Sequence, residues 1–306
     1  MAPRVAALVG PTAAGKTRAS LSLAPLIGAE IVSLDSMQVY RGMDVGTAKP
    51  TVAMRAAVPH HLLDLFEPSH ELSVAEFQSL GRSAIGEVTA RGNRPLLVGG
   101  SGLYVRSVVD DLRFPPHSPE VRRGLDTEIE QQGTQALYAR LIELDPTAAQ
   151  RIEPGNSRRI VRALEVIEVT GRPFSENYSW ERFESLYDLS IAGITLPRDQ
   201  LYAGIEKRVD AMLKDGLLEE VRRLEAAGMG RTSRHALGYR QVLDAAPGTS
   251  VQQIRDEIVA ATKRFARRQE SWFRADPRVV WFDAADRALI ERLAGFFDRL
   301  PARPSR

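Results

Sequence analysis

Cysteine is absent from this chain, which excludes disulfide bonds and thiolate-bound metal sites. The five histidines show no ligand spacing such as H-E-x-x-H, so the sequence gives no sign of a zinc centre. No apolar run reaches 18 residues, and no charged segment followed by an apolar one marks a signal peptide. These absences predict a protein of the cytoplasm.

An excess of charge of one sign is also lacking, because 41 Lys and Arg residues are nearly balanced by 39 Asp and Glu, which gives a net charge of +2. So small an excess does not by itself indicate a nucleic-acid partner. The chain of 306 residues is 43% hydrophobic and 26% charged, which are ordinary globular values. Its length is enough for two lobes.

A phosphate-binding loop is the strongest local signal. The segment "GPTAAGKT" fits G-x-x-x-x-G-K-[ST], with an apolar run before it and a helix-forming stretch after it. Glycines let the backbone turn its N–H groups inward, Lys16 supplies a point charge, and Thr17 supplies a hydroxyl ligand for magnesium. The loop binds a polyphosphate group and does not determine the rest of the ligand, so ATP is one of several possible ligands. The predicted diphosphate-binding residues are Gly10, Pro11, Thr12, Ala13, Ala14, Gly15, Lys16 and Thr17.

Further along the chain, buried-strand patterns alternate with helical ones, as in "AEIVSLDS", "RPLLVGG", "LSIAGITL" and "RVVWFD". This alternation predicts an α/β fold, a P-loop core with a doubly wound, mostly parallel sheet. Between residues 113 and 188 the pattern becomes helical, with Pro and Gly breaks. We therefore expect a core domain of residues 1–112 and 189–306 and a helical insertion domain of residues 113–188. A single long helix is expected over 201–227.

Two acidic residues are candidates for chemistry near the phosphates. Asp35 follows the second predicted strand and therefore lies at the carboxyl edge of the sheet, where open parallel sheets place their ligands. Asp64 in "PHHLLDLF" is the other candidate. The strand "RPLLVGG" ends in Gly99 and Gly100, whereas an ATP-hydrolysing protein is expected to end it with an acidic residue for magnesium. The ATPase interpretation is weakened accordingly.

Basic residues gather in two places. Segment 231–278 holds ten Lys or Arg against five Asp or Glu, and "NSRRIVR" places three arginines on one turn of the insertion. On the helix near residue 260, the pattern predicts a core face of Ile254, Ile258, Ala261, Phe265 and Trp272. It predicts an opposite, basic face of Lys263, Arg264, Arg267 and Arg274. Such a stripe is either a solvated surface or a nucleic-acid contact.

Taken together, several segments resemble the bacterial tRNA dimethylallyltransferase (tRNA isopentenyltransferase) family. They are "GPTAAGKT", "SLDSMQVYRGMDVGTAKP", "VPHHLLD", "LLVGGSGLY", "RRIVRALEV", "RVDAML", "ALGYRQ" and "ATKRFARRQESWFR". The resemblance implies transfer of a dimethylallyl group from dimethylallyl diphosphate to the exocyclic N6 amine of adenine 37. That base lies 3′ of the anticodon in tRNAs reading codons that begin with U. Partners would be tRNA and dimethylallyl diphosphate, with Mg²⁺ as cofactor and a monomeric enzyme.

The same resemblance implies residue roles. Asp35 would be the general base, while Thr12 and Arg208 would act on the departing diphosphate, and Thr17 would ligate the metal. The insertion domain would contact tRNA. The implied tRNA-binding residues are Asp35, Ser36, Met37, Gln38, Ser101, Arg158, Arg159, Ile160, Val161, Arg162, Arg240 and Gln241. His60 and His61 match a family block, but nothing in their spacing assigns them a role.

Three other functions remain open on the residues alone. A small-metabolite or nucleotide kinase would share the loop, the aspartate and magnesium. A nucleic-acid-binding module would keep the loop as a vestige, against which the intact Lys16 and Thr17 argue. A prenyltransferase acting on free adenine nucleotides would share the core chemistry, but the two basic clusters favour a polymer.

Overall fold

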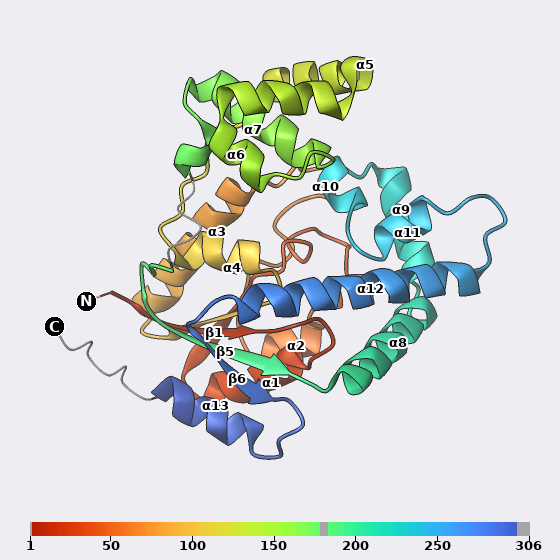
Figure 1. Cartoon of the computed structure of the whole chain (residues 1–306). Helices are drawn as coiled ribbons and strands as arrows, with labels where there is room; N and C mark the ends of the chain where they lie inside the picture. Colours follow the sequence, from red (N-terminus) through yellow and green to blue (C-terminus); the bar gives the residue numbers. More distant parts are fainter. Residues whose placement is uncertain (1, 178–182, 299–306) are drawn as a thin grey trace. The chain divides into compact units, whose positions relative to one another are not determined.

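One parallel sheet organises the larger part of the chain (Figure 1). The computed structural model describes residues 2–177 and 183–298. Every pairing between named strands is parallel, in the order β3-β2-β4-β1-β5-β6. The expected doubly wound α/β fold is confirmed. The strands are β1 (Arg4–Val9), β2 (Ala29–Ser33), β3 (His60–His61), β4 (Arg94–Gly99), β5 (Asp188–Thr195) and β6 (Val279–Asp283).

Helices cover both faces of this sheet (Figure 1): α1 and α13 pack on one face, and α3, α4 and α12 cover the other. The central strands are buried on both sides and read as continuous apolar runs, as parallel strands between helical layers should. The helices of this unit are α1 (Lys16–Leu26), α2 (Val52–Ala57), α3 (Val74–Ala90), α4 (Gly102–Val109), α8 (Arg198–Lys214), α9 (Leu217–Ala227), α10 (Arg231–Arg234), α11 (Tyr239–Leu243), α12 (Val251–Arg274) and α13 (Leu289–Asp298).

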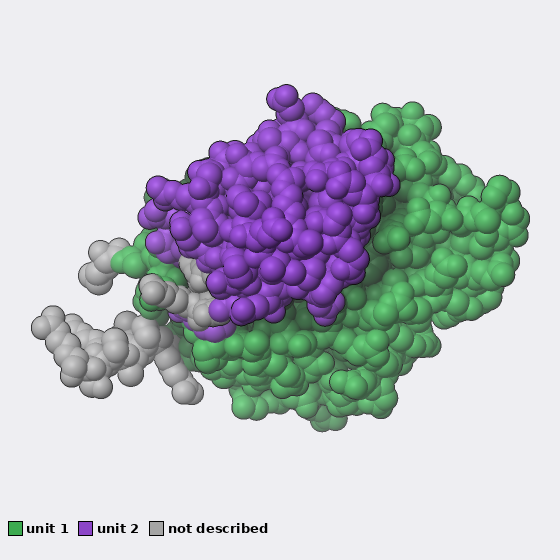
Figure 2. Space-filling view, turned by 45° about the horizontal axis from the view of Figure 1, so that its top comes forward, with its two compact units in different colours: residues 1–110, 184–306 green, residues 111–183 purple. Residues whose placement is uncertain are grey.

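The chain divides into two compact units, coloured separately in Figure 2. The sheet unit comprises residues 1–110 and 184–306, and the second unit comprises residues 111–183. Aliphatic side chains of the second unit form a separate hydrophobic core. Gly133, at φ 82°, interrupts its long helix α5. The helices of this unit are α5 (Pro119–Leu144), α6 (Pro146–Arg151), α7 (Ser157–Thr170) and the 3-10 helix η1 (Phe174–Asn177).

One expected helix is wrong, and one strand was not foreseen. The helix expected over 201–227 is two helices, because Gly216 adopts φ 96° and its left-handed backbone ends α8 and starts α9. The short strand β3 was not expected from the sequence, since two residues are too few to show an alternating pattern.

The buried face of α12 also differs from the expected one. Ile254 and Ile258 are buried as predicted, but Trp272 is 41% exposed. The remaining buried positions are one residue further along, at Val259, Thr262, Ala266, Gln269 and Phe273. The buried face could not be predicted correctly because it includes Thr262 and Gln269, and a search for apolar residues assigns polar side chains to the surface. Within the residues that the structure describes, no helix is long and apolar enough to cross a membrane.

A matched pair of substitutions in α5 tests the core of the second unit. Leu137 is fully buried and Leu144 is 44% exposed. We expect Leu137→Ala to lower the free energy of unfolding by about 2–5 kcal/mol, because it removes buried methyl groups and leaves a cavity. Leu144→Ala should cost less than about 1 kcal/mol. Chemical denaturation followed by circular dichroism measures both, and equal losses would contradict the assignment of Leu137 to the core.

Candidate active site

The phosphate-binding loop connects the carboxyl end of β1 to the first residue of α1. Gly10 has φ 143°, and a Cβ atom there would lie 2.4 Å from the carbonyl oxygen of Ile194, so only glycine fits. Gly15 caps α1 in the left-handed conformation. The Nζ atom of Lys16 donates to the carbonyl oxygens of Gly10 and Pro11, each at 2.8 Å. The lysine is therefore held over the loop, where phosphate oxygens would replace these carbonyls.

Gln269 of α12 is a site residue that the sequence did not reveal. Its side-chain oxygen accepts a hydrogen bond from the backbone N–H of Thr12 at 2.8 Å, across 257 positions of sequence. Gln269 is 6% exposed and lies on the buried face of α12. A polar residue on the buried face of an amphipathic helix could have indicated this role. The predicted buried face was wrong by one residue, so Gln269 was not placed on it.

Glycines after β4 make room for α12 and for the segment after β2. A Cβ at Gly99 would lie 2.8 Å from the Cβ of Leu34, and one at Gly100 would lie 2.3 Å from the Nε2 of Gln269. At Gly102 it would lie 1.7 Å from the Cδ1 of Trp272. This packing explains why β4 ends without an acidic residue, because an aspartate in place of Gly99, the last residue of the strand, would collide with Leu34.

Three charged side chains gather around the loop. Lys16, Asp35 and Arg208 are each partly buried and lie close enough to shift one another's pKa values. Burial and the nearby Arg208 lower the pKa of Lys16 to about 7, although Asp35 opposes the change. Burial raises the pKa of Asp35 and lowers that of Arg208. The site thus combines two cations that lack their full hydration with a carboxylate that binds a proton more readily than usual.

The residues after Asp35 form a tight turn that fixes its direction. The N–H of Met37 donates to the Asp35 carboxylate at 3.0 Å, and the N–H of Gln38 donates to the Asp35 carbonyl at 3.2 Å. The side chain of Gln38 accepts from the Ser33 hydroxyl at 2.9 Å and donates to the Thr47 carbonyl at 3.2 Å.

Three other predicted contacts of the sheet unit lie at the starts of two helices. Ser101 is the N-cap of α4, and its side chain makes no capping hydrogen bond. In α11, Arg240 is exposed and pairs with Asp244 at 3.0 Å, while the side-chain oxygen of Gln241 accepts from the Gly238 N–H at 2.8 Å.

The predicted contact segment of the second unit begins α7. Arg158 and Arg159 are exposed, whereas Ile160 and Val161 belong to that unit's core. Arg162 donates to the carbonyls of Pro115 and Pro116 and pairs with the buried Glu165 at 2.9 Å. In this segment, Arg158 and Arg159 are therefore the side chains open to a ligand.

Asp64 and the paired histidines have structural partners. The carboxylate of Asp64 pairs with Lys49 and Arg55, both at 2.6 Å. His61 contacts Glu30 at 2.6 Å, and His60 contacts the Val58 carbonyl at 2.7 Å. Asp35 is left as the acidic group beside the loop.

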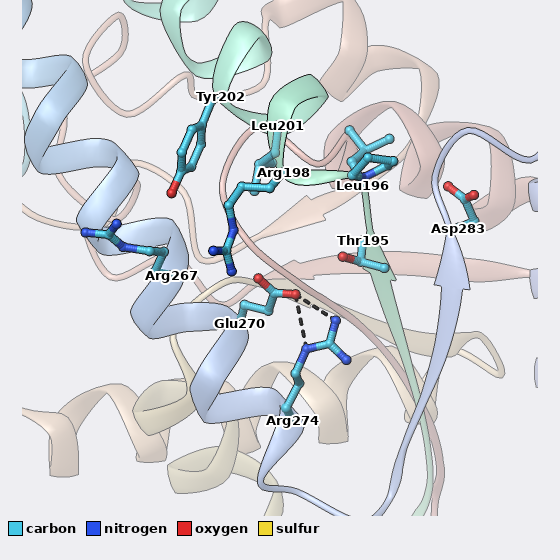
Figure 3. Close-up of a pocket in the computed structure, with 10 residues that line it drawn as sticks. Thr195, Leu196, Arg198, Leu201, Tyr202, Arg267, Glu270, Arg274 and Asp283 are labelled. Atoms are coloured by element: carbon cyan, nitrogen blue, oxygen red, sulfur yellow. Dashed lines mark hydrogen bonds and ion pairs between the residues drawn. The ribbon is translucent and has the colours of Figure 1, made fainter.

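A recess of about 300 Å³ lies at the ends of β5 and β6 (Figure 3). Its wall includes Arg198, Arg267 and Arg274, and Glu270 accepts from Arg274 at 2.7 and 3.1 Å. On the basic stripe of α12, Lys263 likewise pairs with Glu206 at 2.5 Å. The stripe is therefore partly neutralised by acidic neighbours.

The described residues contain no group of three or more acidic, His or Cys side chains that could hold a metal. Magnesium commonly binds through one or two protein oxygens and the oxygens of a bound phosphate. The exposed Thr17 at the start of α1 supplies a hydroxyl oxygen of that kind. The residues fit a magnesium ion that arrives with a diphosphate.

A parallel sheet, a phosphate loop and a partly buried carboxylate at the same edge define a P-loop protein that acts on a phosphate-bearing substrate. The family model described as IPP transferase matches residues 38–276, and that described as isopentenyl transferase matches residues 3–58. This chain belongs to the IPP transferase family.

Individual relatives agree with this assignment. The chain is 54% identical over 298 residues to the tRNA dimethylallyltransferase of Streptomyces coelicolor, covering 96% of this chain and 95% of the relative. It is 54% identical to the enzyme of the same name from Kineococcus radiotolerans, covering 92% and 90%. Among solved structures, the full-length tRNA isopentenylpyrophosphate transferase from Bacillus halodurans is 40% identical with a TM-score of 0.71, covering 96% and 95%.

Binding of inorganic diphosphate should depend on pH through Lys16. Its pKa is about 7 in the free protein, and a bound anion raises it, so binding above pH 7 requires proton uptake. We expect the affinity to fall by about tenfold per pH unit between about pH 7.5 and 8.5, below the pH at which inorganic diphosphate loses its own last proton. Calorimetry in two buffers of different ionisation enthalpy measures the uptake. In Lys16→Arg the slope should disappear, and an unchanged slope would contradict this pKa.

Proposed function

We propose that this chain is a tRNA dimethylallyltransferase, which transfers a dimethylallyl group from dimethylallyl diphosphate to the N6 amine of an adenine in tRNA. The observation that carries the proposal is the joint placement of Lys16, Arg208 and Asp35 at the phosphate loop of a chain in the IPP transferase family. The name of its relatives, tRNA dimethylallyltransferase, describes transfer of a dimethylallyl group to tRNA and supports the proposal.

Stabilising the leaving group is the first task of such a site. The C–O bond of an allylic diphosphate breaks when the charge on the departing diphosphate is stabilised, and donors fixed in advance are the usual means. Lys16 and the loop N–H groups provide them, with Arg208 reaching in from α8 and the Thr12 hydroxyl at the loop. Magnesium on Thr17 would neutralise further negative charge on the phosphates.

Activating the adenine amine is the second task. As N6 bonds to the allylic carbon, the amine becomes strongly acidic and must lose a proton. Asp35 is the acceptor, since its raised pKa brings the carboxylate nearer to the proton affinity that a general base needs. The balance is one C–N bond formed, one C–O bond broken, diphosphate released and one proton passed to Asp35.

Recognition of the tRNA is assigned to residues near this carboxylate and to exposed arginines. Ser36, Met37 and Gln38 form the turn after Asp35, which follows β2. Ser101 follows the carboxyl end of the neighbouring strand β4. A base stacked in an RNA loop must leave its stack to reach such a site. We propose adenine 37, 3′ of the anticodon in tRNAs that read codons beginning with U, as the target.

A transfer assay tests the whole proposal. Radiolabelled dimethylallyl diphosphate, magnesium and unmodified tRNA with adenine 37 are incubated with the protein, and a parallel reaction contains AMP in place of tRNA. Label in the tRNA supports the proposal. Label only in AMP would replace it with a nucleotide prenyltransferase, and ATP turnover without prenyl transfer would replace it with a kinase.

Asp35→Asn should separate chemistry from binding. The amide keeps the shape but cannot accept the proton, so kcat is expected to fall by about 10²- to 10⁴-fold. The affinity for inorganic diphosphate should not fall, because the substitution removes a negative charge next to Lys16. Single-turnover assays and calorimetry measure the two quantities, and an unchanged kcat would remove Asp35 from the catalytic role.

Arg158 and Arg159 are tested through the salt dependence of tRNA binding. Each phosphate contact contributes roughly one to the slope of log affinity against log salt concentration. The double variant Arg158→Ala, Arg159→Ala should lower this slope by about one to two. Arg172→Ala, an exposed arginine in the same unit, serves as the control. Equal slopes for both variants would place the tRNA elsewhere.

A further inference from the structure

Glu220 of α9 is a buried carboxylate with an unusual set of partners. It is 6% exposed, and its two oxygens accept four hydrogen bonds. Three come from the successive backbone N–H groups of Asp44, Val45 and Gly46, at 3.0, 2.9 and 3.1 Å. The fourth comes from the hydroxyl of Tyr239 at 2.6 Å. Successive N–H groups in a turn form a concavity that binds an anion, and here Glu220 occupies it.

Hydrogen-bond donors alone balance the charge of Glu220, since none of the ion pairs among the described residues includes it. Burial and the neighbouring carboxylate raise the pKa of Tyr239, so its phenol remains a donor at any physiological pH. Burying a charge in this way is costly when packing is the only purpose, because an apolar side chain would fill the space at lower free energy.

On one side, Glu220 fixes the loop that begins at Asp35. Beyond the three N–H groups, the carbonyl of Thr47 accepts from Gln38, whose N–H donates to the Asp35 carbonyl. A Cβ at Gly46 would lie 2.4 Å from the ring of Tyr239, so the loop and this ring are in tight contact. A second contact from α9, in which Arg223 donates to the Gly42 carbonyl at 3.2 Å, holds the middle of the same loop.

On the other side, Glu220 fixes α11. Tyr239 is fully buried and is the first residue of that helix, directly before Arg240 and Gln241. One carboxylate therefore ties together two segments that are separate in the sequence: the loop that follows the Asp35–Gln38 turn, and α11, whose Arg240 and Gln241 are among the tRNA contacts expected from the family resemblance.

We propose that Glu220 is a positioning residue for the target adenosine, which sets the spacing between the Asp35–Gln38 turn and α11. This inference rests on the proposed function. The phosphate loop makes none of these contacts, so Glu220 should govern the use of tRNA without altering the use of the diphosphate.

Glu220→Gln is the test, because the amide keeps the size but replaces one acceptor oxygen with a donor that faces N–H groups. We expect kcat/KM for tRNA to fall by about 10- to 100-fold, the range for losing one hydrogen bond to a charged group. KM for dimethylallyl diphosphate and the affinity for inorganic diphosphate should stay within about twofold. Tyr239→Phe, which removes one donor, should show the same split with a smaller loss.

Glu219→Gln is the matched control, since it makes the same change at an exposed neighbour on the same helix and should leave every constant unchanged. If Glu220→Gln lowers the use of both substrates alike, or neither, the positioning role is overturned. Should Glu220→Gln fail to fold, the split in Tyr239→Phe decides in the same way. Absence of transfer by the wild-type protein would overturn the proposed function itself, and the inference with it.

Discussion

The site depends on positive charge held in place before its anionic ligand arrives. Lys16 and Arg208 are partly buried near each other, so each loses hydration and repels the other. Asp35 offsets part of this cost, and the carbonyls of Gly10 and Pro11 hold the ammonium group. A bound diphosphate would replace the hydrogen bonds from Lys16 to these carbonyls with stronger, charge-assisted hydrogen bonds. Burial in the same place raises the pKa of Asp35 although Arg208 and Lys16 oppose the change, so loss of hydration prepares both the leaving-group side and the base side of the reaction.

Close packing by glycine makes this crowding possible. Gly10 lies against the carbonyl of Ile194, and Gly99 and Gly100 admit Leu34 and Gln269. The side-chain oxygen of Gln269 then accepts a hydrogen bond from the N–H of Thr12, so α12 supports the phosphate loop. The sheet, the phosphate loop and α12 are held together by close contacts, which a methyl group added at Gly10, Gly99 or Gly100 would disrupt.

Sequence reasoning succeeded where the signal is local. The phosphate loop is a spacing of a few residues with a backbone geometry attached, and the buried strands are apolar runs bounded by turns. It failed where the deciding contact is distant or where one residue changes the geometry. Gly216 divided the expected helix over 201–227, and the buried face of α12 could not be read because Thr262 and Gln269 look like surface residues.

By itself, the sequence determined the fold class, the phosphate loop, Asp35 at the sheet edge and, through motif order, the family, because each of these is encoded in short segments with fixed spacing. Only the tertiary structure decided which polar side chains serve those segments. Gln269 on Thr12, Glu220 on the loop after Asp44, and the burial that shifts the pKa of Lys16 all arise from residues far apart in the chain. The physical reason is that hydrogen-bond partners and loss of hydration depend on what packs around a group in space, and neighbours in sequence do not specify that.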